Sequence, residues 1–82
     1  MSEKQGNLAP ILVIDDEEQI RTAMTIALRS AGFEHVVSAG DANEALEIVR
    51  SGRCALVTLD LYLPGMPGLE VLPLLIEAQP DL

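Results

Sequence analysis

The sequence is poor in basic residues and in aromatic side chains. It contains 5 Lys and Arg against 13 Asp and Glu, which gives a formal net charge of −8. Because nucleic acids and anionic membranes attract basic surfaces, we expect neither as a direct partner. Only Phe33 and Tyr62 are aromatic, so stacking platforms for single-stranded nucleic acid are missing too. A positive counter-ion or a basic protein surface suits this chain better.

Cysteine and long apolar runs are also scarce. Cys54 is the single cysteine, so no internal disulfide can form, and we expect a reducing, cytoplasmic setting. No signal segment is recognised at the start, and every apolar run is far shorter than a membrane span. At 82 residues with 49% apolar content, the chain suits one small domain with a core. We expect residues 1–9 to form a flexible tail and residues 10–82 to form the domain.

Strand and helix patterns alternate three times along the chain. Short apolar or β-branched runs predict strands near residues 11–14, 35–39 and 55–59. Apolar side chains at helical spacing predict helices near residues 20–31, 42–49 and 69–78, the last interrupted by Pro73. The order βαβαβα implies parallel strands joined by right-handed crossovers. The predicted fold class is therefore α/β, as part of a doubly wound parallel sheet.

Acidic residues follow two of the predicted strands. Asp15 and Asp16 come directly after the first strand, and Asp60 comes directly after the third. If these strands are neighbours, the three carboxylates converge at the carboxyl edge of the sheet, where open α/β sheets bind ligands. Carboxylates this close repel each other, and Mg²⁺ removes the repulsion because it prefers oxygen ligands. The spacing therefore predicts a cation site.

A local alternative explains part of the acidic run. Asp16 can be the N-cap of the following helix, with Glu17 and Glu18 in its first turn, where the helix dipole favours negative charge. This interpretation suits the two glutamates. It does not explain Asp60, which lies in another part of the sequence.

Two segments resemble the receiver domain of two-component response regulators. They are I-L-V-I-D-D-E-E at residues 11–18 and L-V-T-L-D-L-Y-L-P-G-M-P-G-L-E-V-L at residues 56–72. The family's acidic pair matches Asp15 and Asp16. Its second motif, an aspartate followed by Pro and then Gly at fixed spacing, matches Asp60, Pro64 and Gly68. The resemblance covers residues 11–82 and implies a flavodoxin-like sheet with the strand order 2-1-3.

The resemblance also implies a function and a set of site residues. Asp60 would accept a phosphoryl group from a histidine kinase or a phosphotransfer protein. Mg²⁺ would be held by Asp15, Asp16, Asp60 and the main-chain carbonyl of Tyr62. Such a module is not an enzyme. A phosphatase of the haloacid dehalogenase type needs a second aspartate where Tyr62 stands, and the first strand-to-helix turn has no nucleotide-binding glycine.

The chain also departs from the family pattern. A complete receiver has five βα units, whereas three are recognised here, and the Ser or Thr and the Lys that contact the phosphoryl group belong to the other two. The only lysine, Lys4, lies in the expected tail. We therefore expect a receiver truncated after the third unit, with an exposed strand edge at residues 55–59 and an apolar third helix. Such surfaces predict a homodimer or a swapped assembly. An alternative function is a receiver-like fragment that acts as a non-phosphorylated interaction or dimerisation module.

Overall fold

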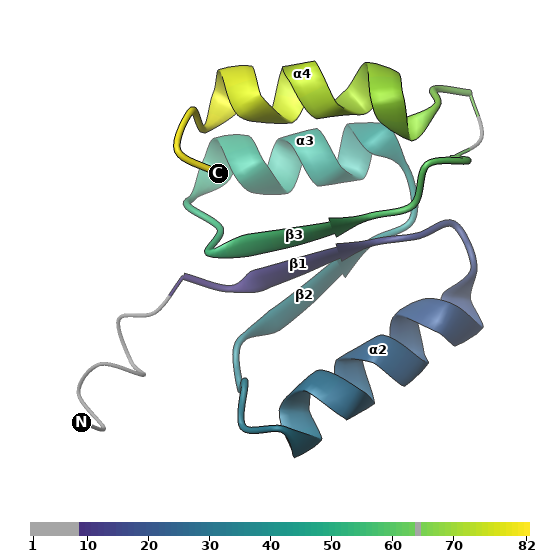
Figure 1. Cartoon of the computed structure of the whole chain (residues 1–82), viewed down its shortest axis with the longest axis vertical. Helices are drawn as coiled ribbons and strands as arrows, with labels where there is room; N and C mark the ends of the chain where they lie inside the picture. The colour runs from purple at the N-terminus through teal and green to yellow at the C-terminus, as the bar shows by residue number, and fades with distance from the viewer. Residues whose placement is uncertain (1–8, 64) are drawn as a thin grey trace.

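The computed structural model describes residues 9–63 and 65–82 (Figure 1). Most of the expected tail, including Lys4, and the motif proline Pro64 lie outside the described residues. The order of elements is the predicted βαβαβα. The elements are β1 (Ile11–Ile14), α2 (Glu18–Ser30), β2 (Val36–Ala39), α3 (Ala42–Ser51), β3 (Leu56–Leu59) and α4 (Gly68–Ala78).

The strands of the described residues form one parallel, three-stranded sheet in the order β2-β1-β3, which confirms the predicted order. Ile11 lies opposite Val36 in β2 and opposite Leu56 in β3. All four residues of the central strand β1 are buried, as expected for an apolar strand without alternation. β3 lies at an edge of the sheet, as the sequence predicted.

The two faces of the sheet are covered unequally. Helices α3 and α4 lie side by side over one face, whereas α2 lies over the other (Figure 1). The main core forms on the α3 and α4 side, where Leu12 and Ile14 of β1 meet Leu46, Val71 and Leu75 of the helices. No residue of α2 is buried. The amphipathic pattern of α2 was predicted correctly, but its apolar side stays partly exposed.

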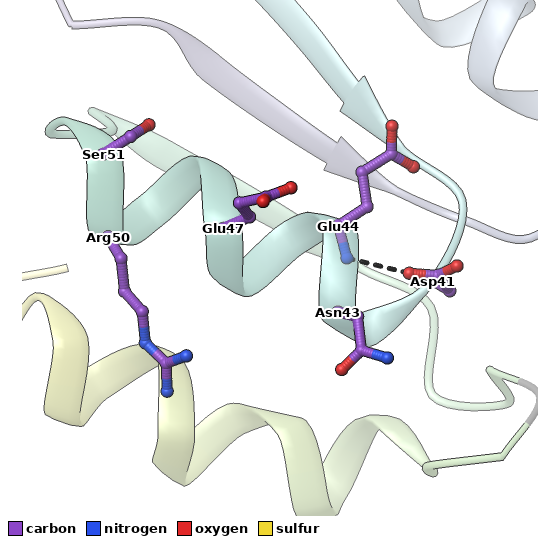
Figure 2. Close-up of a pocket in the computed structure, with 6 residues that line it drawn as sticks. All are labelled: Asp41, Asn43, Glu44, Glu47, Arg50 and Ser51. Carbon is purple, nitrogen blue, oxygen red and sulfur yellow. Dashed lines mark hydrogen bonds between the residues drawn. The ribbon is translucent and has the colours of Figure 1, made fainter.

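Helix α3 begins with the capping arrangement that the sequence spacing predicted. The N–H of Glu44 donates to Oδ1 of Asp41 at 2.8 Å (Figure 2). In return, Oε1 of Glu44 accepts from the N–H of Gly40 at 2.9 Å. These reciprocal bonds satisfy donors that the helix start would otherwise leave unpaired. They fix the loop between β2 and α3 at the same edge of the sheet as the acidic residues.

Helix α4 runs across Pro73, which is its sixth residue. Pro73 therefore lies inside the helix and does not end it. Because proline has no N–H, the carbonyl of Leu69 loses its usual helical partner. Both Leu69 and Pro73 are exposed residues. α4 is apolar on more than one side, as predicted: three of its large side chains are exposed, namely Leu69, Leu72 and Ile76.

The end of α4 is tied to the start of β3 by the buried side chain of Gln79. Its amide nitrogen donates to the main-chain carbonyl of Cys54 at 2.7 Å, and its oxygen accepts from the N–H of Cys54 at 2.8 Å. An ion pair between Arg53 and Asp81 lies next to this contact on the surface. The side chain of Gln79 thus satisfies both main-chain groups of Cys54, much as a neighbouring strand does.

Candidate divalent-cation site

The predicted convergence of three aspartates is present at the carboxyl edge of the sheet. Ile14 of β1 lies opposite Leu59 of β3, so the residues that follow these strands emerge at the same end. One carboxylate oxygen each of Asp15, Asp16 and Asp60 lies within 4.8 Å of the others. Asp15 and Asp60 are half-buried and Asp16 is exposed. The geometry brings together all three side chains that the sequence singled out.

The carboxylates of Asp15 and Asp60 are each held by a hydrogen bond from a nearby main-chain N–H. Oδ1 of Asp15 accepts from the N–H of Glu17 at 2.9 Å, and Oδ1 of Asp60 accepts from the N–H of Tyr62 at 3.0 Å. Each bond joins a residue to the second residue after it, which is an Asx turn. Within residues 9–63 and 65–82, the second oxygen of each carboxylate accepts no hydrogen bond. Those oxygens are therefore available to a ligand.

The main chain of both aspartates is anchored to the neighbouring strand. The N–H of Asp15 donates to the carbonyl of Ala39 at 3.1 Å, and the N–H of Asp60 donates to the carbonyl of Ile14 at 3.0 Å. A further bond reaches Asp15 from helix α2, where Nη1 of Arg21 donates to its main-chain carbonyl at 2.7 Å. The acids thus stand on a fixed backbone at the edge of the sheet.

The helix-start alternative is only partly right. Helix α2 begins at Glu18, which lies in its first turn as expected. The N-cap position is occupied by Glu17, not by Asp16, and the side chain of Glu17 makes no capping bond. Asp16 is exposed and has no hydrogen-bond partner in the described part of the chain. Capping therefore does not account for Asp16, which lies instead in the cluster of three carboxylates.

The donor set fits a hard divalent cation. Three carboxylates that close together repel one another, and an ion that takes oxygen ligands relieves the repulsion. Mg²⁺ is typically held by one or two carboxylates together with water and phosphate, which an open, half-buried edge permits. The N–H of Tyr62 is held by its hydrogen bond to Asp60. Tyr62 itself is 85% exposed to solvent. The role of its carbonyl as a ligand stays a prediction.

Sequence reasoning missed two residues at this edge. Arg21 was not singled out because no short motif joins a helix side chain to a carbonyl six residues earlier. Gly68 was noted only as part of the family motif, and its close packing on the backbone of Asp60 depends on the tertiary fold.

None of the helices in the described residues is long and apolar enough to cross a membrane.

The fold and the site together define a class of protein. The parallel sheet in the order β2-β1-β3, with acids at the carboxyl ends of two adjacent strands, has the architecture of a flavodoxin-like domain, a fold in which ligands bind at this edge of the sheet. The comparison with protein families matches residues 11–82 to the response regulator receiver domain. The chain belongs to this family, and it is a receiver domain of the two-component response regulators. Receiver domains of this kind are signalling modules.

Individual relatives agree with this assignment. The chain is 49% identical over 61 residues to the DNA-binding response regulator MtrA of Mycolicibacterium smegmatis. The matched segment covers 74% of this chain and 26% of that protein. It is 37% identical over 82 residues to the probable transcriptional regulatory protein TcrX of Mycobacterium tuberculosis, and the matched segment covers 35% of that protein. The chain thus spans about a quarter to a third of the length of these relatives.

A solved structure shows the same fold with a ligand. It is the response regulator TrrA of Thermotoga maritima in complex with Mg²⁺ and BeF, which is 38% identical to this chain. The two superpose with a TM-score of 0.82 over 90% of this chain and 64% of that one.

Proposed function

We propose that Asp60 accepts a phosphoryl group at a Mg²⁺ site formed by Asp15, Asp16, Asp60 and the main-chain carbonyl of Tyr62. The observation that carries this proposal is the convergence of the three carboxylates to within 4.8 Å at the end of β1 and β3. Membership of the receiver family supplies the type of chemistry. The complex of TrrA with Mg²⁺ supports the choice of ion.

The chemistry needs a nucleophile held in a fixed direction. A carboxylate oxygen of Asp60 attacks the phosphorus of a phosphohistidine, and the bond from phosphorus to the imidazole nitrogen breaks. The electron pair of that bond stays on the imidazole, and the product is an acyl phosphate on Asp60. The hydrogen bond from the N–H of Tyr62 fixes the direction of the attacking carboxylate. When bound, Mg²⁺ compensates the negative charge of the phosphoryl oxygens.

The partner that delivers the phosphoryl group is a histidine kinase or a phosphotransfer protein. The net charge of −8 and the acidic edge favour a partner with a basic surface around its histidine. The family match does not favour the alternative in which the chain acts only as a non-phosphorylated interaction module.

We also propose that the chain studied alone associates with a second copy through β3 and α4. β3 is an edge strand without a charged residue, and its Leu56 is 53% exposed. Unpaired strand edges of this kind recruit another strand. The exposed apolar side chains of α4 add a second surface that favours burial. A homodimer or a swapped assembly covers both surfaces.

Phosphorylation is tested by intact-mass measurement after incubation with Mg²⁺ and a small acyl phosphate. The proposal predicts an adduct of one phosphoryl group that is lost in Asp60→Asn and when a chelator removes the Mg²⁺. The control is Asp41→Asn, which removes the same charge from an exposed residue at the start of α3. Failure of the wild-type chain to form an adduct, or an undiminished adduct in Asp60→Asn, contradicts the proposal.

A further inference from the structure

We infer that Arg21 is a positioning residue for the cation site, because its guanidinium holds the backbone of Asp15 in the place from which Asp15 and Asp16 face Asp60. This inference rests on the proposed function of that site and adds a residue that does not itself offer a ligand atom to a cation. It begins from a contact between helix α2 and the loop that precedes the helix.

The hydrogen bond from Arg21 is one of three that hold Asp15 in place. Nη1 of Arg21, on the fourth residue of α2, donates to the main-chain carbonyl of Asp15 at 2.7 Å in a partly buried position. The N–H of Asp15 is bound to Ala39, and Oδ1 of its side chain accepts from Glu17. Hydrogen bonds with a charged donor are stronger than neutral ones. The bond from Arg21 therefore restrains the direction in which the chain leaves β1.

The guanidinium also lies close to a second loop. A Cβ built on Gly40 would lie 3.0 Å from Nη1 of Arg21, so only a glycine leaves full space for this side chain. Gly40 directly follows β2 and donates its N–H to Oε1 of Glu44, which ties it to the start of α3. Arg21 thus lies between the loop after β1 and the loop after β2. It is bonded to the first loop and lies close to the second.

Arg21 could affect the Mg²⁺ affinity through its charge or through the position that it gives to Asp15. Removal of the side chain changes the affinity in opposite directions in these two cases. In the described part of the chain, Arg21 forms no ion pair with a carboxylate. Its positive charge alone repels a divalent cation, so a role through charge predicts tighter Mg²⁺ binding when the side chain is removed. A positioning role predicts weaker binding, because the carboxylates lose their fixed arrangement. The direction of the change identifies the role.

The experiment compares Mg²⁺ affinity in four chains by calorimetric titration, with the fluorescence of Tyr62 as a second readout. Tyr62 is the only tyrosine, there is no tryptophan, and its N–H is bound to Asp60. We expect Arg21→Ala to weaken Mg²⁺ binding by about tenfold, as for other residues that orient metal ligands. Arg29→Ala is the matched control, because Arg29 lies on the same helix, carries the same charge and makes no side-chain hydrogen bond in the described part of the chain. We expect it to bind Mg²⁺ as the wild type does.

A second variant perturbs the contact without changing the charge. Gly40→Ala places a methyl group 3.0 Å from Nη1 of Arg21, so the guanidinium must shift by a few tenths of an ångström, and we expect Mg²⁺ binding to weaken by less than in Arg21→Ala. Amide hydrogen exchange of Glu17 in the metal-free chain follows the bond to Oδ1 of Asp15 directly. We expect this amide to exchange faster in Arg21→Ala than in Arg29→Ala.

The outcomes separate this inference from the proposed function. If the wild type binds Mg²⁺ and Arg21→Ala binds it equally or more tightly, the positioning role is overturned and the cation site stands. If the wild type binds no Mg²⁺, the proposed cation site is overturned. In that case the exchange of the Glu17 amide still decides whether Arg21 holds the loop, and equal exchange in the two arginine variants overturns the inference.

Discussion

Gly68 lies directly against the backbone of Asp60. A Cβ on Gly68 would lie 2.6 Å from the main-chain oxygen of Asp60 and 2.7 Å from the Cα of Leu61, both too close for any real side chain. The N–H of Gly68 donates to the carbonyl of Leu61 at 2.9 Å. The backbone of Gly68 does not have a positive φ, so space, not backbone conformation, requires the glycine. The first residue of α4 therefore supports the loop that carries the candidate phosphoacceptor.

We expect Gly68→Ala to disturb both stability and cation binding. The methyl group meets backbone atoms that cannot turn aside, so the helix or the loop must move, which typically costs about 1–3 kcal/mol of unfolding free energy. Urea unfolding measures this loss, and titration with Mg²⁺ shows weaker binding. Gly52→Ala is the control, since a Cβ at Gly52 meets nothing within 4 Å and its φ is −173°. Equal effects of the two substitutions would contradict the argument from space.

The capping arrangement of α3 gives a prediction about stability alone. Asp41→Ala removes the acceptor of the Glu44 N–H, so we expect a loss of about 1 kcal/mol of unfolding free energy. Asp41→Asn keeps an acceptor oxygen and should lose much less. Neither variant should change Mg²⁺ binding, because Asp41 is not one of the three converging carboxylates. Urea unfolding and titration together check this expectation, and a large loss in Asp41→Asn would argue against the cap.

Burial of Cys54 predicts a protected thiol and a pH dependence at the alkaline end. Removal from water raises the pKa of the Cys54 thiol, because burial disfavours the thiolate. As the pH rises, the unfolded chain therefore loses the thiol proton before the folded chain does. The contribution of the protonated thiol to the free energy of unfolding is full below the ordinary thiol pKa, and it is lost as the pH rises from there through the raised pKa. We expect slow alkylation of the native chain near neutral pH and a flatter alkaline stability profile in Cys54→Ala. Alkylation as fast as in urea would contradict the burial.

Self-association through the sheet edge is tested at Leu56. We expect Leu56→Lys to weaken association of the chain, because a charged residue on an edge strand opposes pairing with another strand. Asn43→Lys, on the exposed side of α3, introduces the same charge away from the edge. Size-exclusion chromatography with light scattering measures the mass of each chain. A compact, stable wild-type monomer would overturn the proposed assembly.

Much of the fold was predictable because its signals are local. Uninterrupted apolar runs located β1 to the residue, and the spacing of Asp41 and Glu44 predicted the start of α3. The strand order followed from the resemblance, and it placed the acids of residues 15, 16 and 60 together. These features depend on periodicity, capping chemistry and one recognisable pair of motifs.

The remaining features depend on contacts between distant parts of the chain. The amphipathic pattern of α2 shows that one side prefers burial, but it does not show whether another element covers that side, and here no residue of α2 is buried. The contact of Gln79 with Cys54 joins residues 25 positions apart and has no sequence signal. The bond from Arg21 to Asp15 and the packing of Gly68 on Asp60 likewise appear only once the elements are assembled.

The most direct test of the account is a Mg²⁺ titration of the wild type beside Asp16→Asn, Asp60→Asn and Asp41→Asn. If the acids after β1 and β3 form one cation site, the wild type binds one Mg²⁺, and Asp16→Asn and Asp60→Asn each weaken that binding by about tenfold or more, whereas Asp41→Asn does not. Equal Mg²⁺ affinity in all four chains, or no binding by the wild type, would contradict the central claim that these three aspartates share a cation.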